Sequence, residues 1–182
     1  MSHPNTPGLR DLQSPNELAR LLDALTSARA AQTLRVPILL KISPDVTLCD
    51  LDQITQTALG ARIDGLIVSN TTIQRPLSLK SRHANESGGL SGAPLFPIST
   101  ALLRETRRRV GSRLTLIGVG GIFSGAEAYA KIRAGASLVQ LYTGLALQGP
   151  GLLRRIKAEL LELLENDGLA STTEAVGADA VS

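Results

Sequence analysis

The sequence predicts a single α/β domain in which parallel strands alternate with helices. Four short runs rich in Val, Ile and Leu recur along the 182 residues, and a segment with the apolar spacing of a helix follows each of them. Strand followed by helix, repeated in this way, is typical of parallel strands joined by right-handed crossovers. The composition, with 43% hydrophobic residues and a formal net charge of +3, is that of one globular domain.

The first helix and strand are predicted between Ser14 and Ile42. Ser14 is a suitable N-cap, Pro15 stands at the first helical position, and Glu17 can complete a capping box. The run 36–42 is apolar and continuous apart from Lys41, which predicts a strand buried on both faces.

The second unit repeats this pattern. Thr47 and Asp50 have the spacing of a capping box for a helix over 47–59, and 65–68 is the next buried strand. A long polar segment, 73–97, follows that strand. Loops of this length in compact domains are usually functional or disordered.

The remaining units complete the series. They are a helix at 98–110, a strand at 114–119, a helix at 124–134, a strand at 137–142 and a helix at 150–166. The last helix is expected to turn Leu153 and Ile156 inward. The segment 169–182 is small and polar, and we expect it to be only partly ordered.

The length limits which fold the units can build. A doubly wound sheet and a barrel share this local pattern, so periodicity does not choose between them. A complete eight-stranded barrel needs at least about 200 residues, and only four strands are predicted here. The chain therefore provides at most half of a barrel.

The composition also excludes several classes of protein. The single Cys49 rules out an internal disulfide and a metal cluster of Cys and His. No apolar run approaches the roughly 18 residues of a membrane-spanning helix, and the first residues lack the features of a signal peptide. The basic cluster 104–113 predicts solvated helix surface, and with few aromatic residues for base stacking we expect no nucleic-acid partner.

Polar or glycine residues follow all four predicted strands, at the edge where parallel strands place their ligands. Gly120 and Gly121 precede a capped helix, which predicts a backbone cradle for phosphate that Thr143 could complete; a simple tight turn is the alternative. Lys41 must be paired, exposed or bound to an anion, and an ion pair with Asp45 is its alternative.

Asn70 follows the second strand. Its amide has the donors and acceptors that suit a planar, amide-rich ligand. Capping of a turn by its own side chain is the alternative.

The assembled motifs resemble those of dihydroorotate dehydrogenases, in the order and spacing of the quinone-reducing, membrane-associated class (class 2). They are HPNTPGLR at 3–10, LKISPD at 40–45, SNTT at 69–72, GGLSG at 88–92, GVGG at 118–121, AGASLVQLYT at 134–143 and GAD at 177–179. The resemblance covers nearly the whole chain. It implies the C-terminal half, about four βα units, of a TIM (β/α)8 barrel, with a partial catalytic domain at 1–168 and a C-terminal tail at 169–182.

The resemblance implies an FMN enzyme that oxidises dihydroorotate to orotate in de novo pyrimidine synthesis. In this family a base removes the C5 proton, hydride passes from C6 to flavin N5, and quinone reoxidises the flavin. The implied location is peripheral, on the cytoplasmic side of the inner membrane. An N-terminally truncated form would instead be soluble in the cytoplasm.

The resemblance also implies the roles of particular residues. His3 stands at the position of the catalytic base, where this class has Ser; a histidine with an ordinary pKa of about 6.5 can act as a general base. The implied substrate-binding residues are Asn5, Asn70 and Thr71. The implied cofactor-binding residues are Lys41, Ser69, Ser91, Gly92, Gly120, Gly121, Tyr142 and Thr143, and no metal site is expected.

The first half of the family's barrel has no counterpart in this sequence. We therefore expect an N-terminally truncated dihydroorotate dehydrogenase; the alternatives are a non-catalytic fragment that retains at most FMN or phosphate binding, and an unrelated phosphate-binding half-barrel. A half-barrel exposes two unpaired strand edges and its apolar inner face. We expect the chain to be poorly stable alone, to self-associate, or to pair with a missing N-terminal half.

Overall fold

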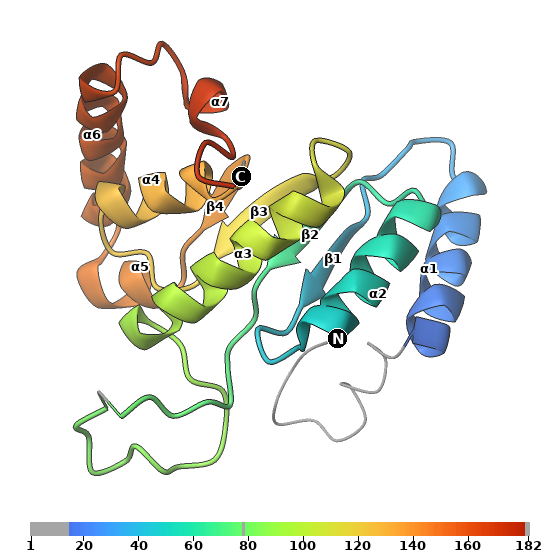
Figure 1. The fold of residues 1–182 in the computed structure, drawn as a ribbon, viewed down its shortest axis with the longest axis horizontal. Coiled ribbons are helices and arrows are strands. Elements are labelled where there is room, and N and C mark those ends of the chain that lie inside the picture. The colour runs from blue at the N-terminus through green and yellow to red at the C-terminus, as the bar shows by residue number, and fades with distance from the viewer. Residues whose placement is uncertain (1–14, 78, 181–182) are drawn as a thin grey trace.

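Four parallel strands form one sheet in the computed structural model of the chain, which describes residues 15–77 and 79–180. The strands are β1 (Leu39–Ile42), β2 (Gly65–Val68), β3 (Thr115–Val119) and β4 (Leu138–Gln140). They lie in the order of the sequence, and each pairs in parallel with the next (Figure 1). The predicted parallel βα repeat is thereby confirmed.

Helices follow the strands as the sequence predicts. They are α1 (Pro15–Ala30), α2 (Leu48–Gly60), the 3-10 turn η2 (Ala93–Leu95), α3 (Phe96–Val110), α4 (Gly125–Arg133), α5 (Thr143–Gln148), α6 (Gly151–Asn166) and α7 (Thr172–Ala175). The predicted capping box is present, because the Thr47 hydroxyl accepts from the Asp50 amide while the Asp50 carboxylate accepts from the Thr47 amide. The two short helices α5 and α7 are not predicted by the sequence pattern.

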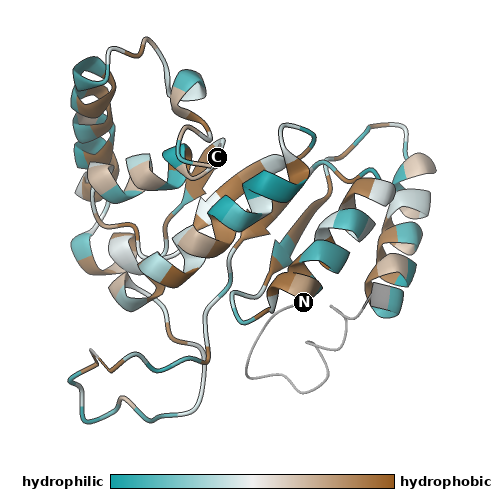
Figure 2. Cartoon of the chain, in the orientation of Figure 1, coloured by the Kyte–Doolittle hydropathy of each residue, from teal (hydrophilic) through white to brown (hydrophobic). Residues whose placement is uncertain are grey.

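The main core lies between one face of the sheet and the helices α1, α2 and α3. Leu40, Leu66 and Leu116 project to this face from adjacent strands and are at most 5% exposed. They meet buried side chains from the helices, among them Leu51 and Leu103. Figure 2 shows the corresponding pattern, with hydrophobic colour along the strands and polar colour on the outward sides of α2 and α3. Burial of this face is the main stabilising contribution to the fold.

The opposite face of the sheet carries a different row of side chains. The strand register aligns Lys41, Ile67, Ile117 and Leu138 across all four strands. Leu138 is 58% exposed, so this face retains apolar surface in contact with solvent. Helices against one face and a partly exposed row on the other are what a segment of a βα barrel presents.

Three predictions about local structure are corrected. The first strand begins at Leu39 rather than at residue 36, and Val36 is 59% exposed. In α6 the buried position near the start is Leu152, while Leu153 is 43% exposed.

The third correction concerns the C-terminal segment, which the sequence predicts to be only partly ordered. Ala175 and Ala180 are buried, and the Gly177 amide donates to the Ile132 carbonyl. The Arg133 guanidinium lies 2.7 Å from the Asp179 carboxylate. The described part of this segment is therefore docked on α4.

Within the described residues, no helix has both the length and the apolar character needed to cross a membrane.

Candidate ligand-binding site

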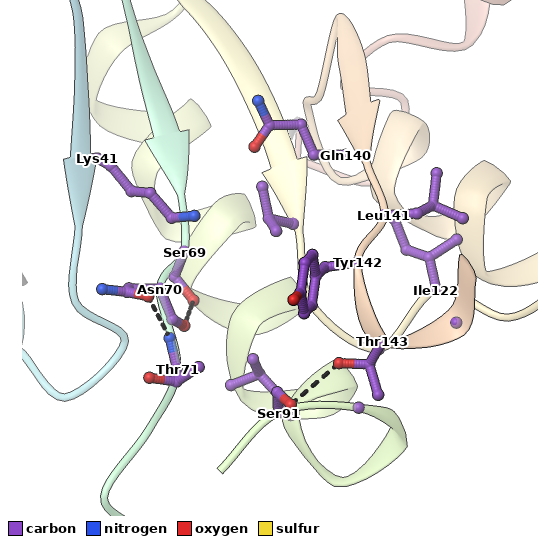
Figure 3. Close-up of a pocket in the computed structure, with 16 residues that line it drawn as sticks. Lys41, Ser69, Asn70, Thr71, Ser91, Ile122, Gln140, Leu141, Tyr142 and Thr143 are labelled. Atoms are coloured by element: carbon purple, nitrogen blue, oxygen red, sulfur yellow. Dashed lines mark hydrogen bonds between the residues drawn. The ribbon is translucent and has the colours of Figure 1, made fainter. Parts of the chain in front are cut away.

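A pocket of about 210 Å³ lies at the carboxyl ends of the four strands. Figure 3 shows side chains from all four strand ends and from the loop after β2 around it. Its lining includes every predicted site residue that the structure describes: Lys41, Ser69, Asn70, Thr71, Ser91, Gly92, Gly120, Gly121, Tyr142 and Thr143. His3 and Asn5 lie outside the described residues.

Lys41 reaches the pocket from β1, on the face of the sheet opposite the main core. Its side chain is half-buried, and burial lowers the pKa of its ammonium group. The alternative ion pair with Asp45 is not formed; the Asp45 carboxylate instead accepts from the Thr72 hydroxyl and, at 2.9 Å, from the Ile73 amide. Within the described residues Lys41 takes part in no ion pair, so its ammonium group is available to an anionic ligand.

The segment after β2 is held by hydrogen bonds within the segment and to the end of β1. The Ser69 hydroxyl donates to the Asn70 carbonyl at 3.0 Å, and the Asn70 amide nitrogen of the backbone donates to the Ile42 carbonyl at 2.9 Å. The Asn70 side-chain oxygen accepts from the Thr71 backbone amide at 2.9 Å. This bond to the next residue along the chain fixes the Asn70 side chain at the pocket wall.

The Gly120–Gly121 turn lies between the pocket and the start of α3. Its residues have φ values of 110° and 76°, a region that favours glycine. A Cβ at Gly121 would lie 2.4 Å from the Phe96 Cβ, and one at Gly120 would lie 2.8 Å from the Ser99 Oγ. Glycine is required here because the backbone packs directly against α3.

The N-terminus of α4 is occupied by carboxylates of the chain itself. The Glu127 carboxylate accepts from the Phe123 amide at 2.9 Å, and the Glu159 carboxylate accepts from the Gly125 amide. The predicted phosphate cradle therefore has fewer free backbone amides at the start of α4 than the sequence suggests. The amides left to serve an anion belong to the glycine turn rather than to the first turn of α4.

The loop after β2 closes over the pocket at the end of β4. The Thr143 hydroxyl donates to the Ser91 hydroxyl at 3.0 Å, which joins two segments far apart in the sequence. Gly92 adopts a φ of 80°, and a Cβ there would lie 3.3 Å from Thr143. Tyr142 lines the same side of the pocket and is 83% exposed.

Among the lining residues that the structure describes, one side chain is charged, that of Lys41, and none is a carboxylate. Hydroxyl, amide and ammonium donors together suit a ligand with anionic and carbonyl groups. Further lining residues were not predicted: Leu95, Val119, Ile122, Gln140, Leu141 and Gly144. Strand alternation could have found Val119 and Gln140, which follow core-facing neighbours, whereas nothing in the pattern distinguishes Leu95 or Ile122. No cluster of His, Cys, Asp and Glu suited to a metal ion occurs in residues 15–77 and 79–180.

These features define a segment of a βα barrel whose strand ends carry a pocket lined by hydroxyl, amide and ammonium groups. A sequence model of the family described as dihydroorotate dehydrogenase matches residues 1–164. The chain belongs to the dihydroorotate dehydrogenase family.

Similar proteins agree with this assignment. The chain is 55% identical over 179 residues to dihydroorotate dehydrogenase (quinone) of Parvibaculum lavamentivorans, covering 98% of this chain and 51% of that protein. It is 52% identical to the mitochondrial dihydroorotate dehydrogenase (quinone) of Oryza sativa subsp. japonica, covering 98% of this chain and 39% of the relative. The resemblance to the quinone-reducing class is thus confirmed.

The fold also matches a solved structure. The crystal structure of DHODH from Eimeria tenella in complex with ferulenol superposes with a TM-score of 0.95 at 38% identity, covering all of this chain and 53% of that one. The chain spans about half the length of the bacterial relatives that it matches. The prediction of a partial barrel is therefore confirmed.

Proposed function

We propose that this chain carries the flavin- and orotate-binding part of a dihydroorotate dehydrogenase (quinone). The proposed reaction of the whole enzyme is the FMN-dependent oxidation of dihydroorotate to orotate in pyrimidine synthesis. The observation that carries the proposal is the pocket itself. Ten residues predicted from the family motifs line one pocket, and the one charged side chain in its described lining is positive. Both orotate and a flavin phosphate are anions, which suits this charge.

The donor set fits FMN. The glycine turn and the Ser91–Thr143 hydroxyl pair offer hydrogen bonds to a phosphate, while Lys41 and Ser69 would face the polar edge of the ring system. FMN, when bound, would supply the acceptor for a hydride from the substrate. Negative charge accumulating near Lys41 favours its ammonium form, which burial alone disfavours.

Asn70 and Thr71 would orient the substrate beside the cofactor. Both follow β2, next to Lys41 on the paired strand β1, so substrate and cofactor donors come from adjacent strands. His3 as the base and Asn5 as a further substrate contact complete the proposal; both lie outside the described residues.

The electron acceptor proposed for the whole protein is quinone, which the names of the relatives support. Quinones of respiratory chains dissolve in membranes, so the proposed working place is peripheral, at the cytoplasmic side of the inner membrane. The proposed partner of this segment is the N-terminal half of the family's barrel or a second copy of the chain.

Flavin binding by the purified chain tests the proposal. After incubation with FMN and gel filtration, the visible absorption of the protein peak is recorded, and dihydroorotate is then added without oxygen. Flavin that co-elutes and bleaches supports the proposal. Asn70→Ala should retain the flavin and lose most of the bleaching.

Two other results would change the proposed function. Flavin that co-elutes without bleaching would support the non-catalytic fragment, which the coverage of only half of the relatives favours as the second candidate. A protein peak without flavin would contradict a cofactor site in this chain.

A further inference from the structure

Lys131 is a buried cation that neither the family motifs nor the proposed reaction uses. It lies on α4 and is 0% exposed. Its ammonium nitrogen lies 5.1 Å from the centroid of the Phe96 ring. Among the described residues it takes part in no ion pair, and burial lowers the pKa of the ammonium to about 7. A lysine kept in such a place at this cost calls for a role that an apolar side chain could not fill.

The ammonium group contacts the end of β3, where the pocket begins. Its nitrogen lies 2.5 Å from the Ser99 Oγ and 3.4 Å from the Val119 carbonyl oxygen. The Ser99 hydroxyl in turn lies 3.3 Å from the Gly120 carbonyl oxygen and 3.2 Å from the Phe96 carbonyl oxygen of its own helix, so it can donate to either. Lys131 therefore engages two successive carbonyl groups of the pocket turn, one directly and one through Ser99.

The peptide geometry carries this contact to the pocket. A trans peptide holds its C=O and the following N–H on opposite sides. Because the Gly120 carbonyl faces Ser99 on α3, the Gly121 amide is directed away from α3. Gly120 and Gly121 both line the pocket.

We propose that Lys131 is a positioning residue for the anion site: with Ser99 it holds the Gly120–Gly121 turn so that the Gly121 amide faces the pocket and donates to a bound phosphate group. Identifying that phosphate as part of FMN rests on the proposed function. The interaction with an anion at the turn does not, so the two can be tested separately.

The test follows the Gly121 amide by nuclear magnetic resonance during titration with inorganic phosphate. In the unaltered chain the amide resonance should shift and saturate. In Lys131→Met the dissociation constant for phosphate should rise roughly tenfold, as for the loss of a hydrogen bond to a charged group. Lys157→Met is the matched control, because it makes the same substitution at an exposed position of α6 and should leave the affinity unchanged.

A second arm compares FMN with riboflavin, which lacks the phosphate. Lys131→Met should reduce the preference for FMN over riboflavin by a similar factor. A lysine with only a general structural role would lower both affinities equally, and that result would overturn the proposal. Ser99→Ala keeps the Lys131 ammonium group and removes the hydroxyl that links it to the Gly120 carbonyl. If Lys131→Met does not fold, Ser99→Ala tests the same change in the preference for FMN over riboflavin.

The remaining outcomes separate the two proposals. Folded Lys131→Met with unchanged phosphate affinity, or no phosphate shift at Gly121 in the unaltered chain, would overturn the role of Lys131. Phosphate binding that depends on Lys131, in a chain that binds no FMN, would uphold that role and contradict the proposed function. FMN binding that is insensitive to Lys131→Met and to Ser99→Ala would overturn the role of Lys131 and leave the proposed function standing.

Discussion

At the residue scale, Lys41 is a cation whose charge is not compensated within the described pocket. Burial disfavours its charge, and the described lining of the pocket offers no carboxylate to compensate. We therefore expect Lys41→Met to weaken binding of orotate or FMN by about tenfold or more, since a hydrogen bond or ion pair to a charged group is lost. The folded state should be as stable as before or more so, because a desolvated cation is removed.

Isothermal titration and urea unfolding of the same samples measure both effects. Lys80→Met, which changes an exposed lysine of the loop, is the control and should alter neither. A Lys41→Met chain that is less stable by as much as it binds less tightly would contradict a ligand role for Lys41.

Lys131 gives a prediction about pH and stability. Its pKa is about 7 in the folded chain and near the ordinary 10.5 when unfolded. Between these values the unfolded chain binds a proton that the folded chain does not, so the free energy of unfolding should rise with pH from 7 towards 10. Below pH 7 the lysine is charged in both states, so the cost of burying that charge lowers the free energy of unfolding in full.

Urea unfolding at pH 6.5 and 9.5 measures this, and the difference between the unaltered chain and Lys131→Met isolates one residue. Groups on the packed elements are paired elsewhere: Glu105 with Arg108 and Arg109, Asp167 with Tyr129 and Arg133, and Glu159 with Arg155 and the Gly125 amide. Equal pH dependence in both chains would contradict the assignment.

At the scale of elements, the start of α2 depends on its capping box. Three hydrogen bonds join Thr47 and Asp50: the Asp50 amide to the Thr47 hydroxyl at 3.1 Å, and the Thr47 amide and hydroxyl to the Asp50 carboxylate at 3.0 Å and 2.7 Å. We expect Thr47→Ala to lower the free energy of unfolding by about 1 kcal/mol. Thr47→Ser preserves the hydroxyl and should cost much less; a similar loss in both variants, measured by urea unfolding, would show that the hydroxyl is not responsible.

The elements that could be predicted from the sequence are those whose signal is local. Apolar runs marked the strands, and the cap at Thr47 marked the start of a helix. The short α5 and α7 have too few residues for a periodic pattern to appear. The docking of the C-terminal segment depends on pairs distant in sequence, such as Arg133 with Asp179, which no local pattern reveals.

The candidate site follows the same division. Strand ends of a parallel sheet share one edge, so the family motifs at those ends meet in one pocket. The roles of Lys131 and Leu95 depend on packing between elements. A lysine in a helix ordinarily indicates solvent-exposed surface, and only the contact with Ser99 shows otherwise.

At the scale of the whole molecule, we expect copies of the chain to associate through the face of the sheet opposite the main core. Leu39 and Leu138, on the two edge strands, are 39% and 58% exposed. We expect the apparent mass to rise with concentration in sedimentation velocity, because edges and apolar surface favour pairing. Leu138→Lys should shift the chain towards monomer, whereas Leu161→Lys, at a leucine of α6 that is 61% exposed, should not. A chain that stays monomeric at about 100 µM would contradict this.

The sequential order of the strands has a consequence for synthesis on the ribosome. Each strand pairs with the strand that precedes it, so none must wait for a partner made much later. A nascent chain that has emerged as far as Val119 already holds three strands that can pair, with α2 and α3 available to cover them. Contacts between neighbouring segments close quickly, and domains generally form as they emerge. The sheet can therefore grow one strand at a time from the N-terminal side, and limited proteolysis of stalled nascent chains should detect protected intermediates of increasing length.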